Sequence, residues 1–159
     1  MSEQTQNIVD MLRNKGLTLG VAESATGGLV SHLFTNVPGS SDVYKGSVTA
    51  YANQTKIAVL GVKPETLQQY GAVSPQVAEE MAKGCCCVLN ADICVSDTGI
   101  AGPGGATPDK PLGLFYMGLA HQTTVCSQKH IFQGDREENK KLAAQVIFDW
   151  LEAYLQNLE

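Results

Sequence analysis

The sequence lacks an excess of positive charge: its 159 residues include 11 Lys and Arg against 16 Asp and Glu, a net charge of −5. No basic cluster offsets this balance, which argues against a nucleic-acid-binding or anionic-membrane-binding surface. The sequence also lacks an apolar run near the roughly 18 residues that a membrane-spanning helix needs, and its polar N-terminus carries no secretory signal. We therefore expect a cytoplasmic protein that binds neither nucleic acid nor membrane.

The five cysteines lack the spacing of a metal site. Cys85, Cys86 and Cys87 are consecutive, whereas zinc sites use C-x₂-C pairs or interleaved histidines. The three histidines are scattered along the chain and form no recognisable site. The odd cysteine count, without a secretory signal, predicts reduced thiols. We expect no protein-bound metal and no cofactor.

The composition is that of an ordinary globular protein, with 43% hydrophobic and 17% charged residues. A chain of this length can bury about two thirds of its unfolded surface. No internal repeat, low-complexity tract or linker divides it. We therefore expect residues 1–159 to form a single domain.

Apolar runs alternate with helical stripes along the first two thirds of the chain. The patterns predict strands over residues 17–21, 43–51 and 93–96, and helices over residues 5–15, 29–35, 53–59, 64–71 and 75–89. Two further apolar runs, 113–120 and 125–132, predict an antiparallel hairpin. Alternating helices and strands followed by a hairpin predict an α/β fold, a three-layer α/β/α sandwich with a mixed, mostly parallel sheet.

The ends of two helices are marked by capping residues. Ser74, followed by Pro75, predicts the N-cap of the helix over 75–89. Asp135 predicts the N-cap of a last helix. The apolar residues predicted to form the buried face of that helix are Leu142, Ala143, Val146, Ile147, Trp150, Leu151, Tyr154 and Leu155.

The stretch Ala22-Glu23-Ser24-Ala25-Thr26-Gly27-Gly28 separates a predicted strand from a predicted helix. Such a break presents backbone N–H groups and a hydroxyl, which suits an anionic or carbonyl group. The hydrolase elbow G-x-S-x-G is absent, because Ala22 and Thr26 stand where glycines are needed. On local pattern alone, a helix cap at Ser24 is favoured over a nucleophile.

Tyr51 and Lys56 flank the start of the helix predicted over 53–59. A lysine near a tyrosine can activate a serine if desolvation lowers the lysine pKa from about 10.4 towards 7–8. Asn53 lies three residues before Lys56, on the same side of that helix. The alternative is a solvated surface lysine beside a half-buried tyrosine, and composition alone leaves this choice open.

A glycine-rich loop follows the strand predicted over 93–96. Asp97-Thr98-Gly99 matches the tripeptide of aspartic proteases, but that chemistry pairs two such aspartates on an all-β frame. No Gly-Lys-Ser/Thr follows the glycines, so a phosphate P-loop is excluded. The turn over residues 99–105 suits close approach of a ligand, and a long surface loop is the alternative.

Arg136 stands at the start of the last helix. Its guanidinium could bind a phosphate or carboxylate beside the helix N–H groups. The alternative is an exposed arginine that pairs with Glu137 or Glu138, a contact worth little.

Taken together, these loops resemble the C-terminal domain of the CinA family, including its stand-alone members, the nicotinamide-nucleotide amidases called PncC. The matching stretches are residues 22–28, 38–41, 48–56, 71–74, 98–105, 110–113 and Phe132 with 134–136. They extend over nearly the whole chain in family order. The resemblance favours a nucleophile at Ser24 over a helix cap.

The resemblance implies an α/β/α fold and metal-free hydrolysis of nicotinamide mononucleotide to nicotinic acid mononucleotide and ammonia, in pyridine nucleotide recycling in the cytoplasm. It assigns Ser24 as nucleophile and Lys56 and Tyr51 as its activating partners. Ser41, Thr98 and Arg136 are expected to help form the site. By the same analogy we expect a homo-oligomer, with a dimer as the expected form.

A mechanism can be written from these residues. Lys56, kept neutral by burial, is expected to accept the Ser24 proton directly or through Tyr51. Backbone N–H groups near Thr26, Gly27 and Gly28 are expected to stabilise the oxyanion. Asn53 is also expected to bind substrate. The loop over residues 99–105, including Gly99 and Gly102, would hold the ribose phosphate together with Arg136. Which loop binds phosphate and which forms the oxyanion hole stays open.

The sequence departs from the family pattern in two places. Many relatives carry Cys after the motif serine, where this chain has Ala25, and the helix after Arg136 is less arginine-rich here. These departures favour, as the alternative function, a catalytically silent nucleotide-binding paralogue of the same family.

Overall fold

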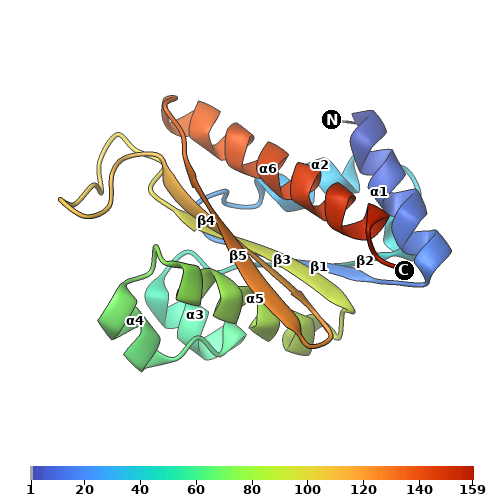
Figure 1. Cartoon of the computed structure of the whole chain (residues 1–159), viewed down its shortest axis with the longest axis horizontal. Coiled ribbons are helices and arrows are strands. Elements are labelled where there is room, and N and C mark those ends of the chain that lie inside the picture. The colour runs from blue at the N-terminus through green and yellow to red at the C-terminus, as the bar shows by residue number, and fades with distance from the viewer. Residues whose placement is uncertain (1) are drawn as a thin grey trace.

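The computed structural model describes residues 2–159 and consists of a β-sheet between two layers of helices (Figure 1). The elements follow in the order α1 (Ser2–Lys15), β1 (Leu19–Glu23), α2 (Leu29–Thr35), the 3₁₀ turn η1 (Ser40–Asp42), β2 (Tyr44–Thr49), α3 (Asn53–Leu60), α4 (Pro64–Tyr70), α5 (Pro75–Leu89), β3 (Ile93–Gly99), β4 (Leu114–His121), β5 (Thr124–Ile131) and α6 (Arg136–Gln156). Helices α1, α2 and α6 lie on one face of the sheet, and α3, α4 and α5 lie on the other (Figure 1).

The five strands are arranged in the order β2-β1-β3-β4-β5. β1 is parallel to both β2 and β3, whereas β4 is antiparallel to its neighbours β3 and β5. β4 alone therefore runs against the other strands, and the predicted α/β fold with a mixed, mostly parallel sheet is confirmed. The carboxyl ends of β1, β2 and β3 meet at one edge of the sheet, where α/β folds place ligands.

Strand β1 begins and ends two residues later than the sequence pattern predicted. It includes Ala22 and Glu23, which pair with Val48 and Thr49 of β2. Glu23 is the last residue of this buried strand despite its charge, because its carboxylate accepts backbone N–H groups at the start of α2. Ser24 is consequently the first residue after the strand.

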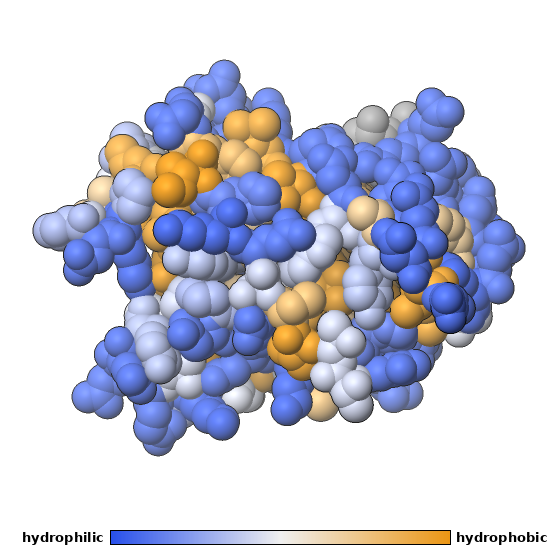
Figure 2. All heavy atoms as spheres, viewed as in Figure 1, coloured by the Kyte–Doolittle hydropathy of each residue, from blue (hydrophilic) through white to orange (hydrophobic). Residues whose placement is uncertain are grey.

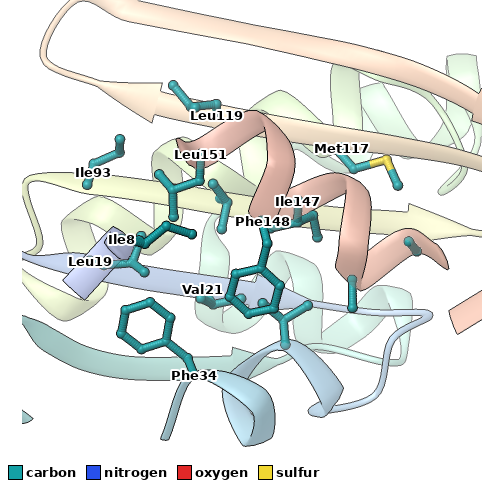
Figure 3. Packing of buried hydrophobic residues seen from close by; sticks show 14 of the residues in the cluster. Ile8, Leu19, Val21, Phe34, Ile93, Met117, Leu119, Ile147, Phe148 and Leu151 are labelled. Atoms are coloured by element: carbon teal, nitrogen blue, oxygen red, sulfur yellow. The ribbon is translucent and has the colours of Figure 1, made fainter. Parts of the chain in front are cut away.

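One hydrophobic cluster fills the space between the sheet and helices α1, α2 and α6. Val21 of β1, Phe34 of α2 and Phe148 of α6 meet at its centre (Figure 3). The rings of Phe34 and Phe148 are nearly parallel, with centroids 6.4 Å apart. Aromatic pairs at this separation add stability beyond the area that they bury.

The buried face of α6 differs from the predicted one, because it also includes Ala144 and Phe148. Its fully buried apolar side chains include Ala143, Ile147, Leu151 and Leu155 at four-residue spacing, while Val146, Trp150 and Tyr154 pack at the margins. Leu142 was expected on this face, but it is 43% exposed. It precedes the buried stripe by one residue, a rotation of about 100° around the helix axis.

Hydrophobic residues also reach the surface. Figure 2 shows hydrophilic residues over most of one face and a hydrophobic patch beside the β3–β4 loop and the start of α6. Exposed apolar side chains there are Leu112 of the β3–β4 loop and Leu142 of α6, and Ile131 at the end of β5 is exposed as well.

The predicted helix caps are present. The Ser74 side chain accepts a hydrogen bond from the backbone N–H of Val77. Asp135 and Glu138 form a reciprocal capping box at the start of α6, which satisfies two N–H groups that the helix leaves unpaired. This cap fixes where α6 begins, and with it the position of Arg136.

Helix α5 packs closely against α3 because Gly84 has no side chain. A Cβ at residue 84 would lie 1.8 Å from the carbonyl oxygen of Leu60. The approach holds the end of α3 in place, and α3 carries Lys56.

We predict that Gly84→Ala destabilises the protein by about 2 kcal/mol, the cost of overpacking a backbone contact. Helix propensity alone would give the opposite sign, a gain of about 1 kcal/mol. Urea denaturation measures the difference. Gly104→Ala is the matched control, because a Cβ there meets no atom within 4 Å. An unchanged or raised free energy of unfolding for Gly84→Ala would contradict the packing.

Candidate active site

A cavity of about 230 Å³ opens where β1, β2 and β3 end. It is bounded by the residue after β1, the β2–α3 connection, the end of β3 with its loop, and the start of α6. The predicted site residues that line it are Ser24, Tyr51, Asn53, Lys56, Thr98, Gly99, Gly102 and Arg136. Segments far apart in the sequence therefore meet at one edge of the sheet.

Lys56 is the most deeply buried cation of the cavity, with 1% of its surface exposed. Its Nζ lies 2.9 Å from Ser24 Oγ, 2.9 Å from the carbonyl oxygen of Ala50 and 3.2 Å from that of Tyr51. Burial lowers the pKa of Lys56 below its ordinary value, while the charge of Asp97 opposes part of this shift.

The three neighbours of Lys56 Nζ define two chemical states. As an ammonium, Nζ donates one hydrogen to each neighbour and cannot act as a base. As a neutral amine, Nζ has two hydrogens for the carbonyls of Ala50 and Tyr51 and keeps one lone pair for the Ser24 hydroxyl. The neutral state can therefore accept a proton from Ser24 directly.

Ser24 is not a helix cap. Helix α2 begins at Leu29 and has Gly28 at its N-cap position, without a capping side chain from that residue. The carboxylate of Glu23 instead accepts the N–H groups of Gly28, Val30 and Ser31. The capping interpretation of Ser24 is therefore wrong, and its hydroxyl faces Lys56.

Thr26, Gly27 and Gly28 do not provide free N–H groups, so the expectation that they stabilise an oxyanion is wrong. The N–H of Thr26 donates to Asp97, that of Gly27 to the carbonyl of Ser24, and that of Gly28 to Glu23. All three residues lie outside the cavity lining. The N–H of Ala25, which lines the cavity, has no hydrogen-bond partner within residues 2–159.

Tyr51 contributes its backbone to Lys56 and its side chain to Arg136. The hydroxyl of Tyr51 accepts a hydrogen bond from Arg136 Nη2 at 3.0 Å, and its side chain is largely exposed. Arg136 Nη1 donates to the carbonyl of Gly102 at 2.7 Å. Within residues 2–159 Arg136 forms no ion pair, so the expected alternative pairing with Glu137 or Glu138 is absent there.

Of the two remaining predicted residues, Thr98 lines the cavity and Ser41 does not. The hydroxyl of Thr98 donates to the carbonyl of Ala72 at 2.8 Å, which ties the end of β3 to the segment before α5. Ser41 lies in η1, which precedes β2, whereas the cavity lies beyond the end of that strand. Ser41 is therefore not among the residues that line the cavity.

Sequence reasoning missed two buried carboxylates, Glu23 and Asp97, both without exposed surface. Burial raises the pKa of Asp97 to about 6, with a further contribution from the charge of Glu23. The available signal was an acidic residue at the end of each of two apolar strands, since buried carboxylates need partners. Asp97 was considered only as half of a protease pair.

None of the helices within residues 2–159 is both long and apolar enough to cross a membrane. The fold and the cavity define a three-layer α/β protein with a buried serine–lysine pair at the carboxyl edge of its sheet. The chain belongs to the CinA family, because residues 1–155 match the model of the CinA C-terminal domain.

Known relatives agree with this assignment. A CinA-like protein of Syntrophomonas wolfei is 48% identical over 146 residues, which cover 92% of this chain but only 35% of that protein. The chain thus spans about a third of such a relative. The CinA superfamily protein KP700603 from Klebsiella pneumoniae matches with a TM-score of 0.95 at 28% identity, covering 99% of this chain and 98% of that one. The competence/damage inducible protein CihA from Agrobacterium tumefaciens matches with a TM-score of 0.93 at 34% identity, covering 98% and 95%.

We predict that a fluorophosphonate reagent labels Ser24 faster as the pH rises, because the neutral form of Lys56 is the base. The midpoint is expected below the ordinary lysine pKa, since burial favours the neutral amine. Mass spectrometry of the labelled protein measures the rate. Lys56→Arg keeps the positive charge but cannot lose it, so its labelling should stay slow at every pH. Labelling of Lys56→Arg at the wild-type rate would refute the base.

Proposed function

We propose that this chain is an amidohydrolase that converts nicotinamide mononucleotide to nicotinic acid mononucleotide and ammonia, with Ser24 as nucleophile. The observation that carries the proposal is the 2.9 Å contact between Lys56 Nζ and Ser24 Oγ at the base of the cavity. The identity of the proposed substrate is inferred from the resemblance to the amidases of the CinA family.

The first half of the reaction breaks the carboxamide bond. Neutral Lys56 accepts the proton of Ser24 as Oγ attacks the carboxamide carbon. The N–H of Ala25 is the free donor on the nucleophile turn for the resulting oxyanion, an interaction worth about 3–4 kcal/mol per donor. Lys56 then returns the proton to the departing ammonia, which leaves the nicotinoyl group bound to Ser24 as an ester.

The second half hydrolyses that ester. Lys56, neutral again, accepts a proton from an attacking water and returns it to Ser24 Oγ. The direct contact between Lys56 and Ser24 supports a route that does not pass through Tyr51, whose hydroxyl is bonded to Arg136. In this proposal Tyr51 anchors Lys56 with its carbonyl and Arg136 with its hydroxyl.

The ribose phosphate is assigned to the side of the cavity that carries Arg136 and the loop over 99–105. Arg136 uses two of its five N–H donors on Gly102 and Tyr51, which leaves donors for a phosphate. Glycines 102, 104 and 105 also line the cavity, where backbone amides can approach an anion closely. The side-chain amide of Asn53, which lines the cavity and forms no hydrogen bond within residues 2–159, is available for the ribose or the carboxamide.

The wider assignments stay predictions of the same proposal. The chain is proposed to form a single domain and to act in the cytoplasm as a homo-oligomer, with a dimer as the expected form. Its catalysis is proposed to need neither metal nor cofactor.

We expect the purified protein to release ammonia from nicotinamide mononucleotide, as measured by a coupled ammonia assay. Ser24→Ala should lower kcat by about 10³-fold or more, because Ser24 Oγ is the only hydroxyl or thiol bonded to Lys56 Nζ within residues 2–159. Ser127→Ala is the matched control. The hydroxyl of Ser127, in β5, donates a hydrogen bond to Glu79 of α5, and neither residue lines the cavity. Equal turnover by Ser24→Ala would contradict the mechanism. Saturable binding of the nucleotide without ammonia release would favour the silent paralogue.

Arg136→Met is expected to raise KM for nicotinamide mononucleotide by about 10-fold or more, because a charge-assisted contact to phosphate is lost. The same variant should affect nicotinamide riboside, which lacks the phosphate, much less. Steady-state kinetics with both substrates measure the difference. Lys63→Met, which removes an exposed cation outside the cavity, should change neither KM. An equal loss for both substrates would place the phosphate elsewhere.

A further inference from the structure

Behind Ser24, two buried carboxylates meet at one hydroxyl group. Thr26 Oγ1 lies 2.7 Å from Glu23 Oε2 and within hydrogen-bond distance of Asp97 Oδ1. All three side chains have 1% or less of their surface exposed. Water therefore cannot stabilise the charge of either carboxylate.

The hydrogens in this cluster can be counted. A threonine hydroxyl has one hydrogen to donate, and two ionised carboxylates have none. Both contacts can be hydrogen bonds only if one carboxyl group carries a proton and donates it to Thr26 Oγ1. Glu23 accepts three backbone N–H groups at the start of α2, which stabilise a negative charge there. The proton is therefore assigned to Asp97, and Thr26 then donates its own hydrogen to Glu23. When Asp97 is ionised, Thr26 Oγ1 can donate that hydrogen to Asp97 Oδ1 instead.

Asp97 also touches the turn that carries the nucleophile. It accepts the N–H of Ser24 and the N–H of Thr26, each at 3.1 Å. These two bonds hold the residues on either side of Ala25, whose own N–H is left unpaired within residues 2–159. The side chain of Asp97 thus fixes the turn that positions Ser24 Oγ.

The charged groups around Asp97 come from three elements. Glu23 of β1 shares the hydroxyl of Thr26 with Asp97. Lys56 of α3 and Asp97 are both buried and both bind Ser24, Lys56 at Oγ and Asp97 at the backbone N–H, so a single residue separates the two charges. Helix α6 brings Lys140, whose Nζ lies 3.5 Å from the Cβ position that Gly27 lacks. On β4 the cross-strand partner of Asp97 is the uncharged Met117. A change of charge on Asp97 is therefore felt mainly by Glu23 and Lys56.

We propose that Asp97 is a positioning residue that sets the base strength of Lys56. Its ionised carboxylate stabilises the ammonium that Lys56 becomes when Ser24 gives up its proton. Its protonated form, which shares hydrogen bonds with Glu23 through Thr26, withdraws that stabilisation. The catalytic part of this assignment rests on the proposed function, whereas the coupling between Asp97 and Lys56 does not.

The coupling is tested by the titration of Lys56 itself, followed by NMR of protein labelled with ¹³C-lysine and assigned with Lys56→Arg. Asp97→Asn keeps the size of the side chain and removes its charge. The midpoint of Lys56 is expected to fall by about 1 pH unit, because a nearby negative charge no longer favours the ammonium. Asp92→Asn is the matched control. Asp92 also accepts a threonine hydroxyl and backbone N–H, those of Thr18, at the opposite end of β3. An unchanged Lys56 midpoint in Asp97→Asn would overturn the proposal.

The pH profile of ammonia release separates this proposal from the proposed function. In Asp97→Asn the rising limb should move to lower pH and the plateau should fall by about 10-fold, because Lys56 becomes a weaker base. A purely structural role would lower the plateau without moving the limb. Absence of ammonia release by the wild type would refute the amidase, while the Lys56 titration would still decide the coupling.

A second pair of variants covers the case in which Asp97→Asn does not fold. Thr26→Val removes the shared hydroxyl, and Thr26→Ser retains it. The hydroxyl favours ionised Asp97, so ¹³C NMR of labelled aspartate should show Asp97 titrating at higher pH in Thr26→Val. Thr26→Ser should restore the wild-type midpoint. Equal Asp97 midpoints in all three proteins would show that Thr26 does not link the carboxylates.

Discussion

The hydrogen bond between Lys56 and Ser24 depends on the burial of an amine at the edge of a sheet. The carbonyls of Ala50 and Tyr51 take two of its three hydrogen-bonding positions, and the remaining one faces Ser24. Burial favours the neutral amine, which is the form that can act as a base. The three parallel strands, which end at the same edge, bring the parts of this arrangement together.

Two carboxylates hold the turn that carries Ser24. Glu23 closes the N-terminal end of α2, so that helix start does not bind an external anion in this arrangement. Asp97 binds the turn from β3. The cavity is left with the side chain of Ser24, the unpaired N–H of Ala25 and the glycine-rich loop beside Arg136. The proposed phosphate site is therefore at Arg136 and not at the start of α2.

The fold could be predicted well from the sequence, because strands, helices and caps are local patterns. The caps at Ser74 and Asp135 and the order of elements were confirmed. The site was harder, since its partners are distant in sequence. The contact of Lys56 with Ser24 followed from a family pattern, and nothing local predicted that Asp97 would bind the same turn. Leu142 was misplaced because the buried face of α6 is centred nearer Ala144 and Phe148 than the apolar pattern indicated.

The central claim is that Ser24 forms a covalent ester with the substrate. The most direct measurement is to mix the protein with nicotinamide mononucleotide, quench within milliseconds and analyse the digested protein by mass spectrometry. The account predicts that the peptide containing Ser24 carries the acyl nucleotide, bound through the former carboxamide carbon. Ammonia release with an unmodified Ser24 peptide, or with the acyl group on another residue, would contradict it.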